Sequence, residues 1–407
     1  MKKSKTFFLR PRQLWEKNLI VLWIGTFMAG IAFSLVMPFL SLYIDTLGKF
    51  SSAQLNLYSG LTYSATFLVM AIVSPIWGGR LADRRGGRKL MILRASFGMA
   101  IVIAAMGLVT NVTQLILLRL LQGVFSGYVS NSNALIATET PKQSSGKALG
   151  ILITGNVTGT LFGPLVGGVV AAIFGYRLTF FLTGLILFLV FLLSAVFVKE
   201  NFQPVPKNKM QTGATIFRNL KNRKIVFGML VTTLLIQLGN FSISPIISLY
   251  IRDLMHHAGP ITIASGIIAS LPGIATLLAA PRLGALGDKI GTARILKIGM
   301  LFAVAIFLPM ALVTNIWQFG SLRFLVGISD GALLPAVQTL LAKNTPATAT
   351  GRIFSYNQSF QAMGNVLGPL LGSTVSGIWN YNGVFISTAV VLFMGFLWVT
   401  FATKEPD

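Results

Sequence analysis

The sequence predicts an all-helical integral membrane protein with twelve transmembrane helices in two pseudo-symmetric six-helix lobes. Three observations lead to this prediction. Apolar residues make up 54% of the 407 residues, apolar runs recur along the chain, and the second half repeats the first at an offset of about 205 residues. An apolar run of about 20 residues is long enough to cross roughly 30 Å of hydrocarbon as a helix. The twelve expected spans lie near residues 19–44, 57–79, 91–110, 113–137, 147–173, 178–198, 225–250, 261–281, 295–313, 316–341, 353–378 and 383–402.

The repeat preserves polar residues inside apolar helices. The stretch TNVTQLILLR at 110–119 returns as TNIWQFGSLR at 314–323. Equivalent positions are Arg119 and Arg323, Gly123 and Gly327, Asp83 and Asp288, Pro141 and Pro346, and the pair 163–164 with 368–369. A duplicated membrane bundle with buried charges at matching places is typical of a transporter whose cargo passes between two lobes. We place the lobes at residues 1–198 and 225–407, joined by a polar linker at 199–224.

The basic residues predict the orientation of the chain. The formal net charge is +23, and 28 of the 33 Lys and Arg residues fall on the side that holds both termini. The opposite side holds only Lys49, Arg177 and Arg252. Because cytoplasmic loops carry an excess of Lys and Arg, we expect both termini in the cytoplasm. No basic segment is interleaved with aromatic residues, which argues against nucleic-acid binding.

A glycine-rich charged loop follows the second span. It reads GGRLADRRGGRK at 78–89, and GALGDKIG at 284–291 is its weaker echo. Glycines at a helix end permit close approach of another helix, and an aspartate among basic residues can pair with them or cap a facing helix. We expect a conformational latch, or gate, at Gly79, Asp83, Arg84, Gly86, Arg88 and Asp288. The alternative is that the basic residues only reflect the orientation of the loop.

The fourth span carries a charged residue and a polar stripe. Arg119, Gln122, Ser126, Ser130 and Asn133 fall on one face if the span is a continuous helix. A charge inside a membrane costs at least about 2.5–3.5 kcal/mol, so this face is expected to look into protein or water. The stripe favours the wall of a wet cavity, with a structural arginine bracing helix ends as the alternative.

The fifth span repeats glycine every four residues. Small residues at this spacing let helices pack backbone to backbone, and a proline inside the run can bend the helix. Simple tight packing remains the alternative to a functional motif. The residues are Gly155, Gly159, Gly163, Pro164, Gly167 and Gly168.

Three ionisable residues are candidates for proton coupling: Asp330, Arg119 and Asp45. Asp330 sits about 21 Å along the tenth span at 1.5 Å per residue, and its counterpart in the first half is Ser126. Burial disfavours the charged form of a carboxylate, which suits reversible protonation. A static hydrogen-bonded acid is the competing interpretation.

Uncharged residues at helical spacing predict a large central site. Such a site suits amphiphilic molecules better than highly polar ones, although each residue taken singly fits packing as well. The candidate substrate-binding residues are Phe33, Met37, Tyr63, Gln122, Asn133, Gln237, Asn240, Phe241, Asn357 and Gln361.

These motifs resemble the major facilitator superfamily, and in particular its bacterial twelve-span drug:proton antiporters. The loop at 78–89 is similar to G-x-L-A-D-R-x-G-R-K with one extra glycine, LRLLQGVFSG at 118–127 follows the R-x-x-q-G pattern, and GNVTGTLFGPLVGG at 155–168 resembles the antiporter glycine–proline element. The resemblance implies proton-driven export of several drug-like compounds by alternating access. It also implies a proton-coupling role for Arg119, and a contact of Asp83 with the eleventh span near Gly351 and Arg352. Import or exchange of sugars or organic solutes is the alternative.

The expected partners are small-molecule substrates, protons and the lipid bilayer of a bacterial cytoplasmic membrane. No cofactor is expected, since the proton gradient would supply the energy and no nucleotide-binding loop occurs in the sequence. The chain has no cysteine and two histidines, and no residue cluster has the spacing of a metal site or a catalytic nucleophile. We therefore expect neither an enzyme nor a metalloprotein, and we expect the chain to act as a monomer.

Overall fold

The computed structural model describes residues 13–75, 87–200, 222–345 and 350–403, and every regular element in these ranges is a helix. The helices of the first half are α1 (Leu14–Leu35), η1 (Met37–Phe39), α2 (Leu40–Asp45), α3 (Ser52–Pro75), α4 (Gly87–Met106), α5 (Val112–Val124), α6 (Tyr128–Glu139) and α7 (Lys142–Phe197). Those of the second half are α9 (Arg223–Ser242), α10 (Ile247–Leu254), α11 (Ile261–Ile290), α12 (Thr292–Met310), α13 (Ile316–Lys343) and α14 (Thr350–Ala402).

Ten helical segments of the described chain are long and apolar enough to cross a membrane. Two of them, α7 with 56 residues and α14 with 53, would measure roughly 80 Å if straight, more than twice the hydrocarbon thickness. Each is interrupted where the sequence places a connection between spans. The backbone leaves the helical region at Gly175 (φ 76°) in α7, and at Trp379 and Asn380 in α14. Each therefore contains two spans, and the predicted twelve-span fold is confirmed.

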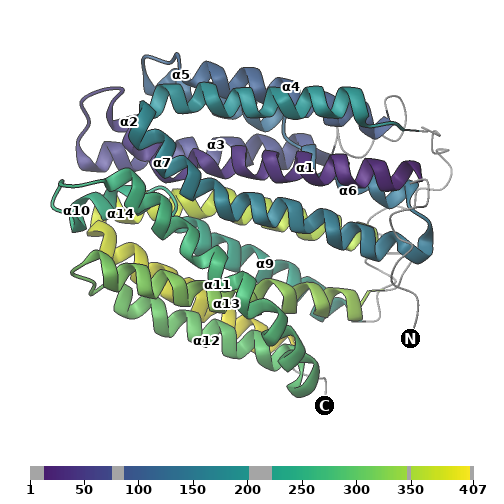
Figure 1. The fold of residues 1–407 in the computed structure, drawn as a ribbon. Helices are drawn as coiled ribbons and strands as arrows, with labels where there is room; N and C mark the ends of the chain where they lie inside the picture. The colour runs from purple at the N-terminus through teal and green to yellow at the C-terminus, as the bar shows by residue number, and fades with distance from the viewer. Residues whose placement is uncertain (1–12, 76–86, 201–221, 346–349, 404–407) are drawn as a thin grey trace, which may run out of the picture.

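The helices of the two halves form two groups that lie side by side (Figure 1). Buried apolar residues between Leu19 and Val198 make one core, and the second half contains two further clusters. The groups meet through α3 against α14 and α7 against α11. We call the end where α1 begins and α14 ends the terminal end, and the opposite end, with the connections 46–51 and 255–260, the distal end (Figure 1).

The sequence repeat is also a structural repeat. The side chains of Asn111 and Asn315 cap α5 and α13 by accepting hydrogen bonds from the backbone N–H groups of Gln114 (2.9 Å) and Gln318 (3.0 Å). An asparagine at this position satisfies a backbone donor that the first helical turn leaves unpaired. The two TN-x-x-Q motifs thus begin equivalent helices in the same way.

The first and seventh spans are present as expected, but neither is a continuous helix. The first span breaks between α1 and α2 around Pro38, and the seventh between α9 and α10 around Pro245. Proline has no N–H to donate, so the helical ladder loses a bond at each of these places. Side chains bind other carbonyls at these breaks: the Tyr63 hydroxyl donates to Met37 O, and Ser41 Oγ donates to Pro245 O at 2.6 Å.

The fourth span is broken as well. Helix α5 ends at Val124 and α6 starts at Tyr128, because Gly127 adopts φ 111° in the left-handed region that glycine reaches without strain. Arg94 on α4 donates to the carbonyl of Ser126 at the break (3.2 Å). The predicted single face from Arg119 to Asn133 is therefore wrong, since the residues after the break do not continue the rotation of α5.

Candidate functional site

Arg119 is buried in the first half between α5 and α3. Its side chain is 2% exposed, and its Nε donates to the carbonyl of Thr62 on α3 (3.2 Å). Nη1 donates to Gln122 Oε1 (2.8 Å), while Nη2 is buried without a hydrogen-bond partner among the described residues. Thr66 on α3 returns a bond from its hydroxyl to the Arg119 carbonyl (3.0 Å). Because these partners are neutral, the guanidinium keeps an uncompensated charge inside the protein, which is costly.

Asp330 lies in the middle of α13 in the second half and is half-buried. Its Oδ1 accepts a hydrogen bond from Asn240 Nδ2 on α9 at 2.9 Å. Arg323, two helical turns earlier on α13, acts on the carboxylate electrostatically and is also half-buried. The structure therefore joins two predicted site residues, Asp330 and Asn240. The described contacts of Arg119 do not include Asp330.

An aromatic contact connects the two halves near these groups. Phe241, the residue after Asn240, meets Phe67 of α3 edge-on, with ring centroids 5.3 Å apart and planes at 81°. Phe33 of α1 is also in edge contact with Phe67, with ring centroids 6.2 Å apart. Phe33 and Phe241 were predicted from the sequence, but Phe67 was missed. Phe67 follows Tyr63 by one helical turn, and this spacing is the signal that could have identified it.

Several predicted substrate-binding residues are engaged in packing in this conformation. Tyr63 is 1% exposed, and its hydroxyl is bound to the backbone of the half-buried Met37. Asn357, 6% exposed, accepts a hydrogen bond from Thr233 Oγ1 at 2.6 Å. Gln122 and Gln237 are buried, whereas Asn133, Asn240, Phe241 and Gln361 are half-buried. A binding role for these residues remains a prediction.

Asp45 pairs with Arg252 at the distal end. The distance from Arg252 Nη1 to Asp45 Oδ2 is 2.6 Å, and the two side chains are 21% and 37% exposed, respectively. The pair joins α2 of the first half to α10 of the second. The bond from Ser41 Oγ to Pro245 O joins α2 to the residues just before α10. Asp45 thus contributes to a contact between the halves, a role that the sequence did not indicate.

The glycines of the fifth span pack against the backbone of α1. A Cβ at Gly155 would lie 2.8 Å from the carbonyl oxygen of Trp23, and Gly159, Gly163 and Gly167 face α1 more closely still. Gly168 faces α11 instead, where a Cβ would lie 2.7 Å from the carbonyl oxygen of Thr262. The helix continues through Pro164, and the break comes later, at Gly175. The motif therefore packs α7 against α1 of the first half and against α11 of the second half.

The predicted gate falls mainly outside the described residues, which applies to Gly79, Asp83, Arg84 and Gly86. At the start of α4, both carboxylate oxygens of Glu200 accept from the backbone N–H groups of Arg88 and Lys89, each at 2.7 Å. An acid at a helix N-terminus is stabilised by the unpaired N–H groups and the helix dipole. Glu200 was missed because it is distant in sequence from the helix that it caps.

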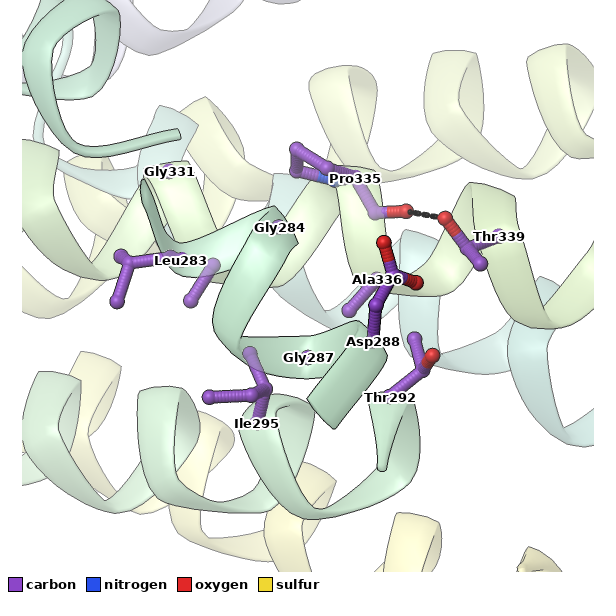
Figure 2. Close-up of a pocket in the computed structure, with 11 residues that line it drawn as sticks. Leu283, Gly284, Gly287, Asp288, Thr292, Ile295, Gly331, Pro335, Ala336 and Thr339 are labelled. Carbon is purple, nitrogen blue, oxygen red and sulfur yellow. Dashed lines mark hydrogen bonds between the residues drawn. The ribbon is translucent and has the colours of Figure 1, made fainter. Parts of the chain in front are cut away.

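Asp288 lines a depression at the terminal end of the second half (Figure 2). Gly284 and Gly287 of α11 and Gly331 of α13 form part of its wall, and Thr292 and Thr339 lie beside the carboxylate. The hydroxyl of Thr339 is occupied by a hydrogen bond to Pro335 O (2.9 Å). This depression lies within one half, so it is distinct from the central cavity predicted between the halves. Within the described residues no group of three His, Cys, Asp or Glu side chains is arranged to hold a metal ion.

Two similar groups of membrane helices with charged residues in their interiors define a membrane transporter. The model of the Major Facilitator Superfamily matches residues 22–266 and 229–407, and the chain belongs to this superfamily. The predicted resemblance is confirmed, as is the prediction that the chain is a transporter and not an enzyme.

Curated relatives are similar over nearly the full chain. The chain is 51% identical over 378 residues to the Multidrug resistance protein MdtG of Enterobacter lignolyticus, covering 93% of this chain and 90% of the relative. The MdtG proteins of Salmonella arizonae (52% over 380 residues, 93% and 94%) and Klebsiella pneumoniae (49% over 392 residues, 96% and 95%) are equally similar.

Solved structures share the fold at low sequence identity. A bacterial homolog of the human lysosomal transporter Spinster, in an inward-facing and occupied conformation, superposes with a TM-score of 0.80 at 16% identity, covering 98% of this chain and all of that one. The nucleoside transporter NupG gives a TM-score of 0.74 at 15% identity, covering 97% and 100%. At this identity the likeness concerns the fold alone.

Proposed function

We propose that this chain is a proton-coupled multidrug efflux antiporter of the bacterial cytoplasmic membrane, exporting amphiphilic drug-like molecules by alternating access. The observation that carries the proposal is the hydrogen bond of the half-buried Asp330 with Asn240, because a protonatable acid sits within a membrane-spanning helix of a transporter whose relatives are named multidrug resistance proteins. An ionised acid in a membrane interior is costly and marks ion or proton pathways by default.

The orientation is also part of the proposal. The excess of basic residues near the terminal end supports a cytoplasmic location for both termini. In that orientation the distal end faces outward. The ion pair of Asp45 with Arg252 and the Ser41–Pro245 hydrogen bond then close the outer side of the pathway in this conformation.

The transport cycle follows from competition between proton and substrate. An antiporter requires that a proton on Asp330 and a bound substrate favour opposite orientations of the halves, since a ligand shifts a conformational equilibrium only through unequal affinity for its states. Arg119 supplies a fixed positive charge on the other side of the pathway. Both halves belong to one chain, so a monomer contains the whole pathway, and the gradient itself supplies the energy without a cofactor.

Proteoliposomes with an imposed pH gradient test this function directly. We expect uphill movement of an amphiphilic dye such as ethidium against the proton flux, and no such movement of sugars. Asp330→Asn is expected to abolish uphill transport and to make substrate exchange at equal pH independent of pH. Asp253→Asn is the matched control, since Asp253 is 48% exposed near the distal surface.

Two outcomes would contradict the proposal. Unaltered uphill transport by the Asp330→Asn variant would remove this acid from proton coupling. Inward, solute-specific uptake of a sugar or organic solute without dye efflux would instead support the alternative function, import or exchange of such solutes.

A further inference from the structure

The Arg119 and Asp330 sites lie in different halves, yet a continuous set of contacts joins them. Asp330 bonds to Asn240 on α9, the adjacent Phe241 meets Phe67 on α3, and the adjacent Thr66 bonds to the backbone of Arg119. Each link is either a direct contact or a step between neighbouring residues of one helix. The ring pair is the link that crosses from one half to the other.

On the second-half side, the contacts lie at the end of a rigid segment. Helix α9 ends at Ser242, only two residues after Asn240, and a turn at residues 243–246 separates it from α10, which begins at Ile247. The last turn of α9 therefore carries both the amide that binds Asp330 and the ring that faces the first half. A shift of this turn moves Asn240 and Phe241 together.

Protonation of Asp330 changes the strength of the hydrogen bond that holds the last turn of α9. The ionised carboxylate accepts a charge-assisted hydrogen bond from Asn240, and such bonds are about twice as strong as neutral ones. Arg323 is the nearest charged residue along the same helix, two helical turns earlier. Helices α9, α11 and α12 pack against α13, and their charged residues lie toward the terminal end of the molecule. These residues are Arg223, Lys224, Arg282, Asp288, Lys289, Arg294 and Lys297. The hydrogen bond from Asn240 on α9 is therefore weakened when the carboxyl group becomes neutral.

On the first-half side, the ring pair is fixed from two directions. Phe67 is 3% exposed and is also in edge contact with Phe33 of α1. The hydroxyl of Thr66 donates to Arg119 O at 3.0 Å and approaches Gln122 Oε1 at 3.4 Å, and Gln122 in turn binds the guanidinium. A displacement of α3 at Phe67 is therefore transmitted to the Arg119 site through these hydrogen bonds.

We propose that Phe67 and Phe241 are positioning residues that transmit the protonation of Asp330 to the first half and thereby couple proton movement to substrate movement. This inference rests on the proposed antiport. While Asp330 is ionised, Asn240 holds Phe241 against Phe67 and the halves stay together at mid-membrane. Once Asp330 is protonated, the turn is released, the rings separate, and the Arg119 site is displaced with α3.

A purely structural role for the rings makes a different prediction. If the pair were only packing, its loss would weaken folding or slow every mode of transport alike. If it couples the two sites, its loss would impair only transport that uses the proton gradient. Substrate exchange at equal pH needs the halves to move but does not need protons to drive them, so it separates the two roles.

The experiment compares Phe67→Leu, Phe241→Leu and the double variant in proteoliposomes. Ethidium is the probe, and both uphill transport under a pH gradient and exchange at equal pH are measured. We expect each single variant to lose at least tenfold more of its uphill transport than of its exchange at equal pH, because a loss of binding lowers both modes whereas a loss of coupling lowers only the first. The double variant should lose no more than either single one, because residues that act through one contact are non-additive.

Two controls complete the design. Phe241→Tyr keeps an aromatic edge and should retain coupling. Phe97→Leu removes a ring from the Phe97–Phe191 contact, which lies within the first half with centroids 5.0 Å apart, and should leave both modes unchanged.

Either of two results would overturn the inference: normal uphill transport in the leucine variants, or equal losses of uphill transport and exchange. Failure of the proposed antiport would look different, because the unmodified protein itself would then show no transport driven by the pH gradient.

Discussion

Asp45 and Arg252 occupy equivalent positions in the two repeats and form an ion pair with each other. They end the matching sequences PFLSLYID at 38–45 and PIISLYIR at 245–252, and they lie 207 residues apart. Equivalent residues of two related halves meet only close to the axis that relates the halves. Identical charges would repel there, and the opposite charges at these two positions turn the contact into a bond.

Charge exchange at this pair tests whether it closes the distal end. Asp45→Arg places two cations together, and we expect about a five- to tenfold loss of transport, modest because a partly exposed pair contributes only about 1 kcal/mol. The double variant Asp45→Arg with Arg252→Asp should recover most of the activity. Failure of the exchanged pair to recover would mean that the identity of each residue, and not their attraction, matters.

Opening of the distal end in the same variants can also be measured by thiol labelling, without a transport assay. The chain has no cysteine, so Ser64→Cys introduces a single thiol at a contact between the halves, where Ser64 Oγ now bonds to Val366 O at 2.7 Å. We expect a membrane-impermeant thiol reagent applied at the distal side to label this position faster in the Asp45→Arg background.

Glycine packing of α7 against α1 predicts a position-dependent effect on stability. Gly163→Ala places a methyl group against the carbonyl of Ile31, 2.7 Å away, and overpacking of this kind costs about 1–3 kcal/mol. Gly150→Ala on the same helix has no atom within 4 Å and should be neutral or stabilise the helix by up to about 1 kcal/mol. Thermal unfolding in detergent would measure both, and equal melting temperatures would contradict the packing argument.

Arg119 is predicted to be required for its charge as well as its hydrogen bonds. Arg119→Gln removes the cation and the bond to the Thr62 carbonyl, and we expect transport to fall by about 100-fold, since one buried charged hydrogen bond is worth about 1.5–3 kcal/mol and the charge itself is lost. Arg119→Lys should retain part of the activity. The control is Arg177→Gln, which removes a distal bond to Val109 O (3.2 Å) and should leave transport nearly unchanged.

The two asparagine caps offer a test of the repeat itself. Asn111→Ala and Asn315→Ala each remove one side-chain acceptor from a helix start, and each is expected to cost about 1 kcal/mol in the free energy of unfolding. The losses should be similar in size because the capping geometry is the same in both halves. A large difference between the two would show that the surroundings, and not the cap, dominate.

Much of the fold was predictable from local pattern. Twelve apolar runs are visible because the hydrocarbon of a bilayer demands long stretches without charge, and the repeat is visible because both halves keep their cap residues, glycines and arginines in order. The helix breaks at Pro38, Gly127 and Pro245 were less accessible. Proline and glycine are tolerated inside membrane helices, so their presence does not say whether the backbone bends, as the unbroken helix at Pro164 demonstrates.

The candidate site divides in the same way. The sequence by itself determined which residues are available for chemistry: one acid deep in a span, two arginines at equivalent places, and the motifs of the superfamily. Only the tertiary structure decided that Asp330 binds Asn240, that Asp45 binds Arg252, and that Phe67 contacts both Phe33 and Phe241. Helical periodicity specifies the face of one helix, but which neighbour meets that face depends on how all the helices pack together.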